Sequence, residues 1–444
     1  MIELVIPAGD VQDVRNRFFG EQVETCAVMY ATYTKRADLL ERLLVRDTQF
    51  PAPGDYTRRG RIEAELNPEF VARITKRARR EKVALIVIHS HLDSTPPIFS
   101  AMDSVGEQRL AAFLAHRHPM PAHLALVISE GGTRSRRLGT EEEVRVLSMG
   151  NNRETLFDPL ATLASTPEVF DRQVRAFGSA GQHALQRLRI AIVGLGGIGS
   201  LIAQQLVHLG VRDFILIDPD VIEITNLNRV ANATHADIGQ PKVDVAARYI
   251  QAVANDAKVA RVQGDIIRAA TARELLSADF IFGCTDSHGS RAVLQQIAYQ
   301  YLIPYIDLGT VIATRDGKID HIYGRIQLLS PGLACFACDG LLDSNEVRRD
   351  MMTAFERQAD PYIQGAREPA PAVMPLNGTV ASLGVTMFLS VVVGVPSGAR
   401  HILYDMRTAT LRVVKAQPNP DCYICSPSGA FARGDDWPIP GRLD

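Results

Sequence analysis

The chain contains 444 residues, of which 46% are hydrophobic and 22% are charged, and its formal net charge at pH 7 is −2. Such a composition is typical of a folded chain of two or three domains. The near-neutral charge gives no electrostatic footprint for nucleic acid, and no apolar run reaches the roughly 20 residues of a membrane span. The first residues lack the basic region and cleavage site of a signal peptide. We therefore expect a cytoplasmic protein that binds neither nucleic acid nor membrane.

The first 150 residues alternate between strand-like and helix-like patterns. Strands are expected at 25–34, 83–88 and 124–128, and helices at 68–82 and 102–116. Residues 136–153 are rich in charge and weakly patterned, which is typical of a domain end that runs into a linker. The Asn151-Asn152 pair is a plausible break.

A cluster of metal-ligand residue types follows the apolar strand at 83–88. His89 and His91 are two residues apart on an extended segment, so their side chains are expected on the same side. Asp103 comes next, near the start of the expected helix, in the sequence Ser100-Ala101-Met102-Asp103. Three protein ligands leave one position on zinc for water, which is the arrangement of a catalytic site.

These residues resemble the JAMM/MPN (JAB) metalloprotease motif, whose enzymes cut isopeptide bonds or trim the C-terminal tails of ubiquitin-like proteins. The resemblance implies that His89, His91 and Asp103 bind zinc and that Ser100 stabilises the oxyanion. It also implies a glutamate general base on an early strand, for which Glu24 is the first choice and Glu21 the fallback. The loop between His91 and Ser100 is one residue longer than in the family, so a structural domain without activity stays an alternative.

From residue 187 onward the pattern becomes a regular alternation of strand and helix. Strands are expected at 189–193, 214–217, 280–282 and 305–308, and helices at 198–209, 242–253 and 290–302. This order predicts an α/β domain with a Rossmann-like doubly wound parallel sheet. The apolar stretch 380–395 contains several serine, threonine and glycine residues and is interpreted as a buried core helix. The tail after Cys425 is rich in proline and glycine and is expected to be loosely ordered.

A glycine-rich turn joins the first strand of this second domain to its helix. Its glycines are Gly194, Gly196, Gly197 and Gly199, which allow a tight turn and let backbone amides approach phosphates. Asp218 lies about 20 residues further on, where a carboxylate suits a ribose hydroxyl. The turn and the aspartate by themselves would favour a nicotinamide-dependent oxidoreductase.

Three further features favour ATP. Asn226 and Arg229 come just after the second strand, Lys242 opens the following helix, and Asp286 ends a later strand at the edge where open sheets bind ligands. Two cations and an amide around a triphosphate, with a carboxylate for Mg²⁺, are needed for phosphate chemistry and not for hydride transfer.

The stretch from Phe170-Asp171-Arg172-Gln173 through Cys425 resembles the ThiF/molybdopterin-synthase adenylyltransferase (MoeB) branch of the ubiquitin-activating superfamily. The resemblance implies ATP-dependent adenylation of a C-terminal glycine carboxylate of a ubiquitin-like or sulfur-carrier protein that ends in Gly-Gly. It further implies that Gly197 and Asp218 contact the nucleotide, that Asp286 binds Mg²⁺, and that Arg172 reaches a neighbouring subunit's ATP site in a homodimer. The phosphates would be held by Asn226, Arg229 and Lys242, and Arg291 would support the site.

The cysteines form two Cys-x-x-Cys pairs, which in a large cytosolic chain indicate a metal before disulfides. The pairs are Cys335 with Cys338 and Cys422 with Cys425, and four thiolates suit a closed, structural zinc site. Only Cys26 and Cys284 remain, and the crossover segment 339–374 contains no cysteine. Superfamily members that form a thioester carry their cysteine there, so adenylation without an enzyme thioester is expected.

The expected organisation is a JAMM/MPN-type domain at 1–148, a linker at 149–160, the adenylation domain at 161–426 and a tail at 427–444. Both halves point to the C-terminus of a ubiquitin-like protein, which one would trim and the other activate. An alternative division is opposition, with one half supporting conjugation and the other removing the modifier. Adenylation of a peptide carboxylate in biosynthesis, and an assembly or binding factor with an inactive protease domain, are the alternatives from other classes.

Overall fold

The computed structural model describes residues 2–35, 40–161, 166–316, 318–353, 355–356 and 371–442. These residues form two compact units. The first is Met1–Leu163 with Gln300–Leu302 and Pro427–Pro438, and the second holds the rest of the chain. The crossover segment at 339–374 lies partly outside the described residues.

The first unit is an eight-stranded mixed sheet in the order β10-β9-β1-β3-β2-β6-β7-β8, with a separate hairpin of β4 and β5. Its helices are α1 (Ala8–Phe19), α2 (Pro68–Glu81) and α3 (Ala101–Arg117), with short 3-10 turns at Pro53–Asp55 and Gly434–Asp436. Its strands are β1 (Ile2–Pro7), β2 (Cys26–Lys35), β3 (Glu41–Gln49), β4 (Tyr56–Arg59), β5 (Ala64–Leu66), β6 (Ala84–Ser90), β7 (Leu124–Ser129), β8 (Gly132–Arg137), β9 (Arg145–Met149) and β10 (Arg153–Phe157).

Two expectations for this unit need correction. The segment expected to be a linker contains β10, which pairs with β9 through an antiparallel hairpin whose turn holds Asn151 and Asn152. The tail after Cys425 is packed rather than loose, because Ala430, Phe431 and Ala432 are buried. The apolar side chains at these positions outweigh the flexibility that the surrounding proline and glycine residues suggested.

The second unit is also built on an eight-stranded sheet, in the order β13-β12-β11-β14-β15-β16-β17-β18. Its strands are β11 (Arg189–Val193), β12 (Asp213–Ile217), β13 (Lys258–Val262), β14 (Phe280–Gly283), β15 (Tyr305–Arg315), β16 (Lys318–Leu329), β17 (His401–Asp405) and β18 (Thr410–Val413). Its helices are α4 (Asp171–Arg187), α5 (Gly199–Leu209), α6 (Lys242–Val253), α7 (Ala269–Glu274), α8 (His288–Gln300), α9 (Phe336–Asp339), α10 (Ser344–Met351) and α12 (Met374–Val392). Short 3-10 turns lie at Glu168–Phe170, Ile224–Asn226, His235–Asp237 and Leu275–Ser277.

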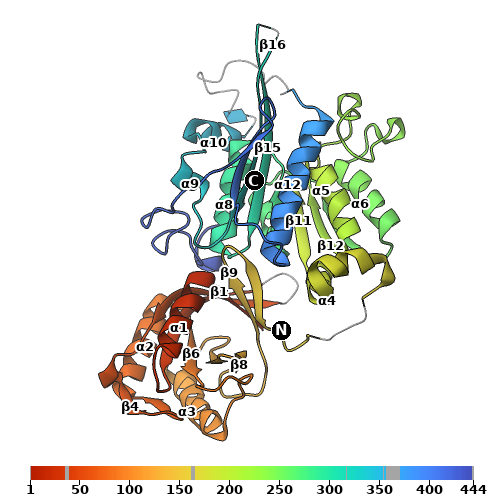
Figure 1. The fold of residues 1–444 in the computed structure, drawn as a ribbon. Coiled ribbons are helices and arrows are strands. Elements are labelled where there is room, and N and C mark those ends of the chain that lie inside the picture. The colour runs from red at the N-terminus through yellow and green to blue at the C-terminus, as the bar shows by residue number, and fades with distance from the viewer. Residues whose placement is uncertain are drawn as a thin grey trace. The chain divides into compact units, whose positions relative to one another are not determined.

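The first five strands of this order are parallel, and the last three are antiparallel. Strand β11 lies between β12 and β14, so the strands that follow β11 in the sequence lie on both sides of it in the sheet. The carboxyl end of β11 is therefore the switch point at which such sheets bind ligands. The predicted doubly wound sheet is confirmed in its parallel part, and Figure 1 shows β15 and β16 extending as a long hairpin.

Helix α12 supplies a large part of this unit's core. It is long and apolar enough to cross a membrane by composition, but 56% of its apolar window is buried inside the protein. Val380, Phe388 and Val391 lie in the same hydrophobic cluster as strand residues of the sheet, and Figure 1 shows α12 beside α5. The helix therefore has the burial of a core helix, as its sequence indicated.

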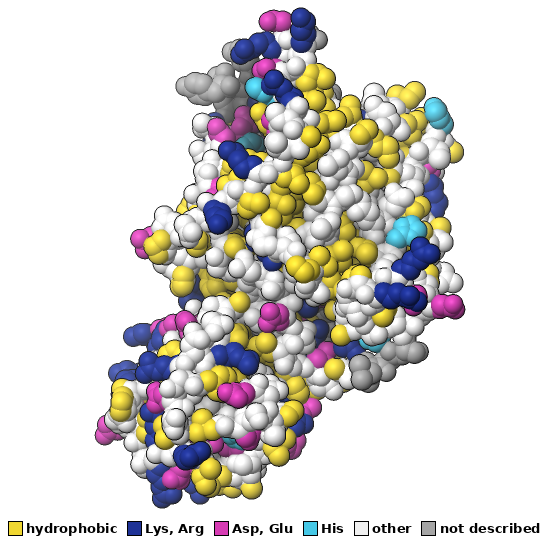
Figure 2. Space-filling model, in the orientation of Figure 1, with side chains coloured by type: hydrophobic (Ala, Val, Ile, Leu, Met, Phe, Trp, Pro, Cys, Tyr) yellow, Lys and Arg dark blue, Asp and Glu magenta, His cyan; other side chains and the backbone are white. Residues whose placement is uncertain are grey.

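Charge is mixed on the surface of the first unit. Figure 2 shows lysine and arginine side chains interspersed with aspartate and glutamate on the visible face. That distribution agrees with the near-neutral net charge of −2.

Candidate functional site

The glycine-rich turn lies at the carboxyl end of β11, as its sequence predicted. Gly194 has a φ of +87°, which favours glycine, and a Cβ there would lie 2.7 Å from the Cys284 carbonyl oxygen. A Cβ on Gly199 would overlap the Gly194 carbonyl oxygen. Gly194 and Gly199 therefore let the turn form without steric strain, and the turn places the start of α5 beside the end of β14.

Asp218 joins the turn to the end of β12. Its Oδ2 accepts a hydrogen bond from the Leu195 amide at 2.6 Å, and its Oδ1 accepts one from the Asp220 amide at 2.9 Å. Burial raises the pKa of Asp218, while the positive charge of Lys242 opposes the rise. The carboxylate is thus held beside the glycine turn, where a nucleotide ribose would lie in folds of this type.

The predicted phosphate-binding side chains lie nearby but contact protein groups. Lys242 Nζ is 2.7 Å from Asp220 Oδ2 and 3.9 Å from Asp218 Oδ1. Arg229 donates to the Thr225 carbonyl oxygen at 2.6 Å, and a Cβ on Gly197 would lie 3.5 Å from Arg229 Cβ. The side chain of Asn226 is buried and accepts a hydrogen bond from the Glu223 amide at 3.2 Å.

Asp286 and Arg172 are exposed. Asp286 follows β14 at the same edge of the sheet as the glycine turn. Arg172 lies in the first turn of α4. A single chain does not contain the neighbouring subunit that Arg172 is predicted to reach.

Arg291, which was predicted to support the site, belongs to a charged network beside the Asp286 loop, and sequence reasoning missed the other members of that network. Asp307 on β15 is fully buried and accepts hydrogen bonds from Arg291 at 3.1 Å, Arg325 at 2.6 Å and Tyr305 at 2.7 Å. Burial opposes ionisation, but the two arginines hold the pKa of Asp307 below its usual value. Arg291 also donates to the Thr285 carbonyl oxygen at 2.9 Å, so the network fixes the residue before Asp286. The one signal in the sequence was a charged residue inside an apolar strand.

The four cysteines of the two Cys-x-x-Cys pairs meet in one cluster. Sulfur atoms are 3.7 Å apart in Cys335–Cys338 and 3.5 Å apart in both Cys335–Cys422 and Cys338–Cys425. A disulfide needs about 2.05 Å, whereas tetrahedral zinc with bonds of about 2.3 Å would separate its sulfurs by about 3.8 Å. The donor set therefore fits a structural zinc ion.

A second cluster lies in the first unit, where β6 ends and α3 begins. Ligand atoms of His89, His91 and Asp103 all lie within 4.8 Å of one another. His89 Nε2 is 3.2 Å from Asp103 Oδ1, and His91 Nε2 is 3.7 Å from Asp103 Oδ2. The first of these nitrogens is buried and has no hydrogen-bond partner of acceptable geometry. Two imidazoles and a carboxylate at these separations fit a zinc ion with an open position.

Ser100 and Asp103 are joined in a capping box at the start of α3. The Ser100 amide donates to Asp103 Oδ2 at 2.6 Å, and Ser100 Oγ accepts from the Asp103 amide at 3.1 Å. The Ser100 hydroxyl proton is not used in these bonds. The side chain can therefore cap the helix and still donate a hydrogen bond elsewhere.

The structure separates the two candidate general bases. Glu21 is paired with Arg59, whose Nη2 lies 2.6 Å from its carboxylate. Glu24 is placed by its own backbone, because its amide donates to the Gly60 carbonyl oxygen at 2.8 Å and its carbonyl oxygen accepts from Arg59 Nε at 3.1 Å. Burial raises the pKa of Glu24, and the charges of His89 and His91 oppose the rise. Glu24 therefore stays the predicted general base, because the alternative, Glu21, is paired with Arg59.

The second unit thus has the fold and the glycine turn of a nucleotide-binding domain with an attached tetrathiolate site. The sequence profile of the ThiF family matches residues 170–424. The chain belongs to the ThiF family.

Two curated relatives each match more than half of this chain. Molybdopterin-synthase adenylyltransferase of Escherichia coli is 26% identical over 262 residues, covering 58% of this chain and 95% of the relative. The SAMP-activating enzyme E1 of Haloferax volcanii is 24% identical over 260 residues, covering 58% of this chain and 87% of the relative. Among solved structures, the E. coli MccB structure with succinimide has a TM-score of 0.47 and 20% identity, covering 59% of this chain and 75% of that chain.

Proposed function

We propose that the second unit uses ATP to adenylate the C-terminal glycine of a ubiquitin-like or sulfur-carrier protein that ends in Gly-Gly. The carrying observation is the glycine turn at the β11 switch point, with Asp218, Lys242 and Asp286 around it. The names of relatives that span this unit support the choice of substrate, since they include a sulfur carrier protein adenylyltransferase from Thermus thermophilus.

In the proposed reaction, a carboxylate oxygen of the terminal glycine attacks the α-phosphorus of ATP. The bond from this phosphorus to the bridging oxygen breaks, which gives an acyl-adenylate and pyrophosphate. Lys242 and Arg229 would leave their protein partners to neutralise the phosphates. Asp286 would hold Mg²⁺, which supplies further positive charge at the phosphates when bound.

Two further features belong to this proposal. Arg172 is exposed on α4 and would act in the ATP site of a second copy, so the adenylating form is a homodimer. Cys284 is committed to the turn region, where burial raises the pKa of its thiol well above its usual value. Because such a thiol is a poor nucleophile, the adenylate would pass to a separate acceptor and not to an enzyme thioester.

The first unit is proposed to be a zinc metallopeptidase of the JAMM type that trims or removes the same ubiquitin-like protein. His89, His91 and Asp103 would hold zinc, which when bound acidifies its water and polarises the scissile carbonyl. Glu24 would accept the proton of the attacking water and pass it to the leaving amine. Ser100 would donate a hydrogen bond from its hydroxyl group to the developing oxyanion.

ATP–pyrophosphate exchange tests the adenylating half. With a candidate protein that already ends in Gly-Gly, we expect exchange by the wild type and a loss of about 100-fold or more in Asp286→Ala. Asp244→Ala is the matched control, because Asp244 is an exposed carboxylate of the same unit that pairs with Arg261. If a short peptide supports exchange and no ubiquitin-like protein does, the result would favour the peptide-carboxylate alternative.

Mass spectrometry of a substrate with residues beyond Gly-Gly tests the peptidase half. We expect wild-type protein to release the extension and Glu24→Gln to release it about 100- to 10,000-fold more slowly. Glu21→Gln should cleave at close to the wild-type rate, since Glu21 is held by Arg59. Equal cleavage by wild type and Glu24→Gln would contradict the assignment.

A further inference from the structure

Behind the proposed metal ligands lies a second layer of polar contacts that centres on Arg136 of β8. The Arg136 side chain is only 5% exposed. Its guanidinium pairs with Glu107 of α3 through two bonds, from Nε to Oε2 at 3.0 Å and from Nη2 to Oε1 at 3.1 Å. A buried ion pair is weak evidence of a stabilising role, because desolvation offsets much of the attraction. Arg136 is therefore a candidate for a positioning role.

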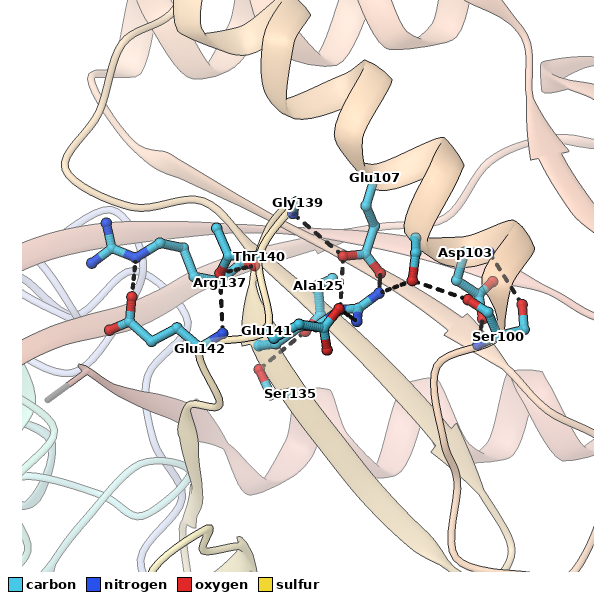
Figure 3. A network of polar contacts seen from close by, with 12 residues as sticks. Ser100, Asp103, Glu107, Ala125, Ser135, Arg137, Gly139, Thr140, Glu141 and Glu142 are labelled. Atoms are coloured by element: carbon cyan, nitrogen blue, oxygen red, sulfur yellow. Dashed lines mark hydrogen bonds and ion pairs between the residues drawn. The ribbon is translucent and has the colours of Figure 1, made fainter.

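The guanidinium also reaches the helix turn that carries Asp103. Arg136 Nη2 donates to Ser104 Oγ at 3.0 Å, and Ser104 Oγ donates to the Ser100 carbonyl oxygen at 3.2 Å. The amide of Ser100 in turn holds the Asp103 carboxylate. Figure 3 shows Ser100, Asp103 and Glu107 along α3, joined by this run of contacts. The position of the Asp103 carboxylate thus depends on a chain of bonds that starts at Arg136.

A second contact leads from Arg136 to the histidines. The guanidinium carbon lies 4.0 Å from the centroid of the Phe99 ring. The Phe99 ring is in turn 6.3 Å from the His89 ring, with the two planes tilted by 56°. One guanidinium therefore borders the supports of two proposed metal ligands that come from different elements, β6 and α3.

We propose that Arg136 is a positioning residue that presets the His89–Asp103 geometry for metal binding. The inference rests on the proposed zinc site of the first unit. Lysine cannot replace this arginine in function, because its ammonium group is a point charge. It cannot form a bidentate pair with Glu107, donate to Ser104 and stack on the Phe99 ring at the same time. Groups behind metal ligands set affinity by holding the ligand orientation.

The test is a cobalt titration of the metal-free full-length protein, with Arg136→Lys as the main variant. Thiolate-to-cobalt charge-transfer bands report the four-cysteine site, so the remaining ligand-field absorption reports the histidine–aspartate site. We expect Arg136→Lys to weaken cobalt binding at the histidine–aspartate site by about 10- to 100-fold. Binding at the cysteine site and the melting temperature of the metal-free protein should stay close to those of the wild type.

Arg134→Lys is the matched control. Arg134 lies on the same strand, pairs with Glu143 at 2.7 Å and lies 6.0 Å over the Phe157 ring. Its pair and its ring both lie outside α3, so its substitution should leave cobalt affinity unchanged. The double variant Glu107→Met/Arg136→Met removes both buried charges together. It replaces Arg136→Lys in the titration if the lysine variant folds poorly. We expect it to weaken cobalt binding as Arg136→Lys does.

The outcomes separate this inference from the proposed site. A folded Arg136→Lys protein with wild-type cobalt affinity at the histidine–aspartate site would overturn the role of Arg136 alone. A wild-type protein that binds no more cobalt than His89→Ala would overturn the metal site, and the positioning role with it.

Discussion

The two units differ in how far their functional side chains are arranged before a ligand binds. In the first unit, the candidate metal ligands already converge within 4.8 Å. In the second unit, Lys242 bonds to Asp220 and Arg229 bonds to a backbone carbonyl, so both cations already have protein partners. The metal ligands come from the end of β6 and the first turn of α3, whereas Arg229 and Asp286 lie outside strands and helices.

The difference shows what would determine ligand selectivity at each site. A preset cluster binds its metal without reorganisation, so its supports decide the affinity. A nucleotide site whose cations have protein partners must exchange these partners on binding, so only a ligand with enough negative charge is favoured. Substitutions should therefore affect the two units in different ways, and the following predictions run from the largest expected effect on stability to the smallest.

Loss of the cysteine site should have the largest effect. Structural zinc contributes about 10–16 kcal/mol of apparent binding free energy in small zinc peptides. We expect Cys335→Ser to lose about one zinc ion per chain and to lower the melting temperature of the second unit strongly. Cys26→Ser, which changes a buried cysteine outside the cluster, should keep full zinc content. Elemental analysis and calorimetry measure both, and full zinc content in Cys335→Ser would contradict the tetrathiolate site.

Asp307→Asn should have the next largest effect, because it removes a fully buried carboxylate and leaves the half-buried Arg291 and Arg325 without a full counter-charge. Breaking a buried ion pair from one side costs about 3–5 kcal/mol. Asp213→Asn removes a more exposed carboxylate that lies 3.3 Å from Arg189, and should cost less than about 1 kcal/mol. Urea unfolding compares the two variants. Equal stability losses would show that the Asp307 network does not support the unit.

A pair of glycine substitutions separates folding of the turn from ligand contact. Gly199→Ala places a methyl group against the Gly194 carbonyl oxygen and should destabilise by about 1–3 kcal/mol. Gly196→Ala meets nothing within 4 Å and should fold normally. If phosphates approach the turn closely, Gly196→Ala should still weaken ATP binding in calorimetric titrations. Wild-type ATP affinity in both variants would argue against the turn as the phosphate site.

His89→Ala should have the smallest effect on stability, because it removes a partly exposed side chain without a hydrogen-bond partner for its Nε2. We expect a change within about 1 kcal/mol in the metal-free protein. Zinc content should nevertheless fall by about one ion per chain. His116→Ala, an exposed histidine at the end of α3, is the control and should keep both ions. A large loss of stability in metal-free His89→Ala would mean that the histidine is structural.

Sequence patterns predicted the strands and helices whose residues alone determine them. Strand β11 and helix α6 have the predicted bounds, because an apolar run before a glycine turn and a helix after proline are unambiguous signals. The pairing of β9 with β10 and the burial of residues 430–432 depend on distant partners, and no local pattern announces them. For the same reason the Asp307 and Arg136 networks were missed, since each joins residues that are far apart in the sequence.

The candidate sites show the same limit. Motif spacing brought together His89, His91 and Asp103, and the four cysteines, as predicted. It did not show that Ser100 and Asp103 cap each other, although Ser-x-x-Asp is close to a capping-box pattern. It ranked Glu24 above Glu21, but it did not show that Glu21 pairs with Arg59 of β4, because that pair joins residues far apart in the sequence.

The most direct test asks whether the two units act on the same C-terminus. ATP–pyrophosphate exchange would be measured with a ubiquitin-like protein that carries residues beyond Gly-Gly, and with its pre-trimmed form, for wild type and Glu24→Gln. We predict exchange with both forms by the wild type, and exchange with only the pre-trimmed form by Glu24→Gln. Exchange with the pre-trimmed form alone by the wild type, while the extended form stays uncleaved, would contradict the claim that trimming precedes activation.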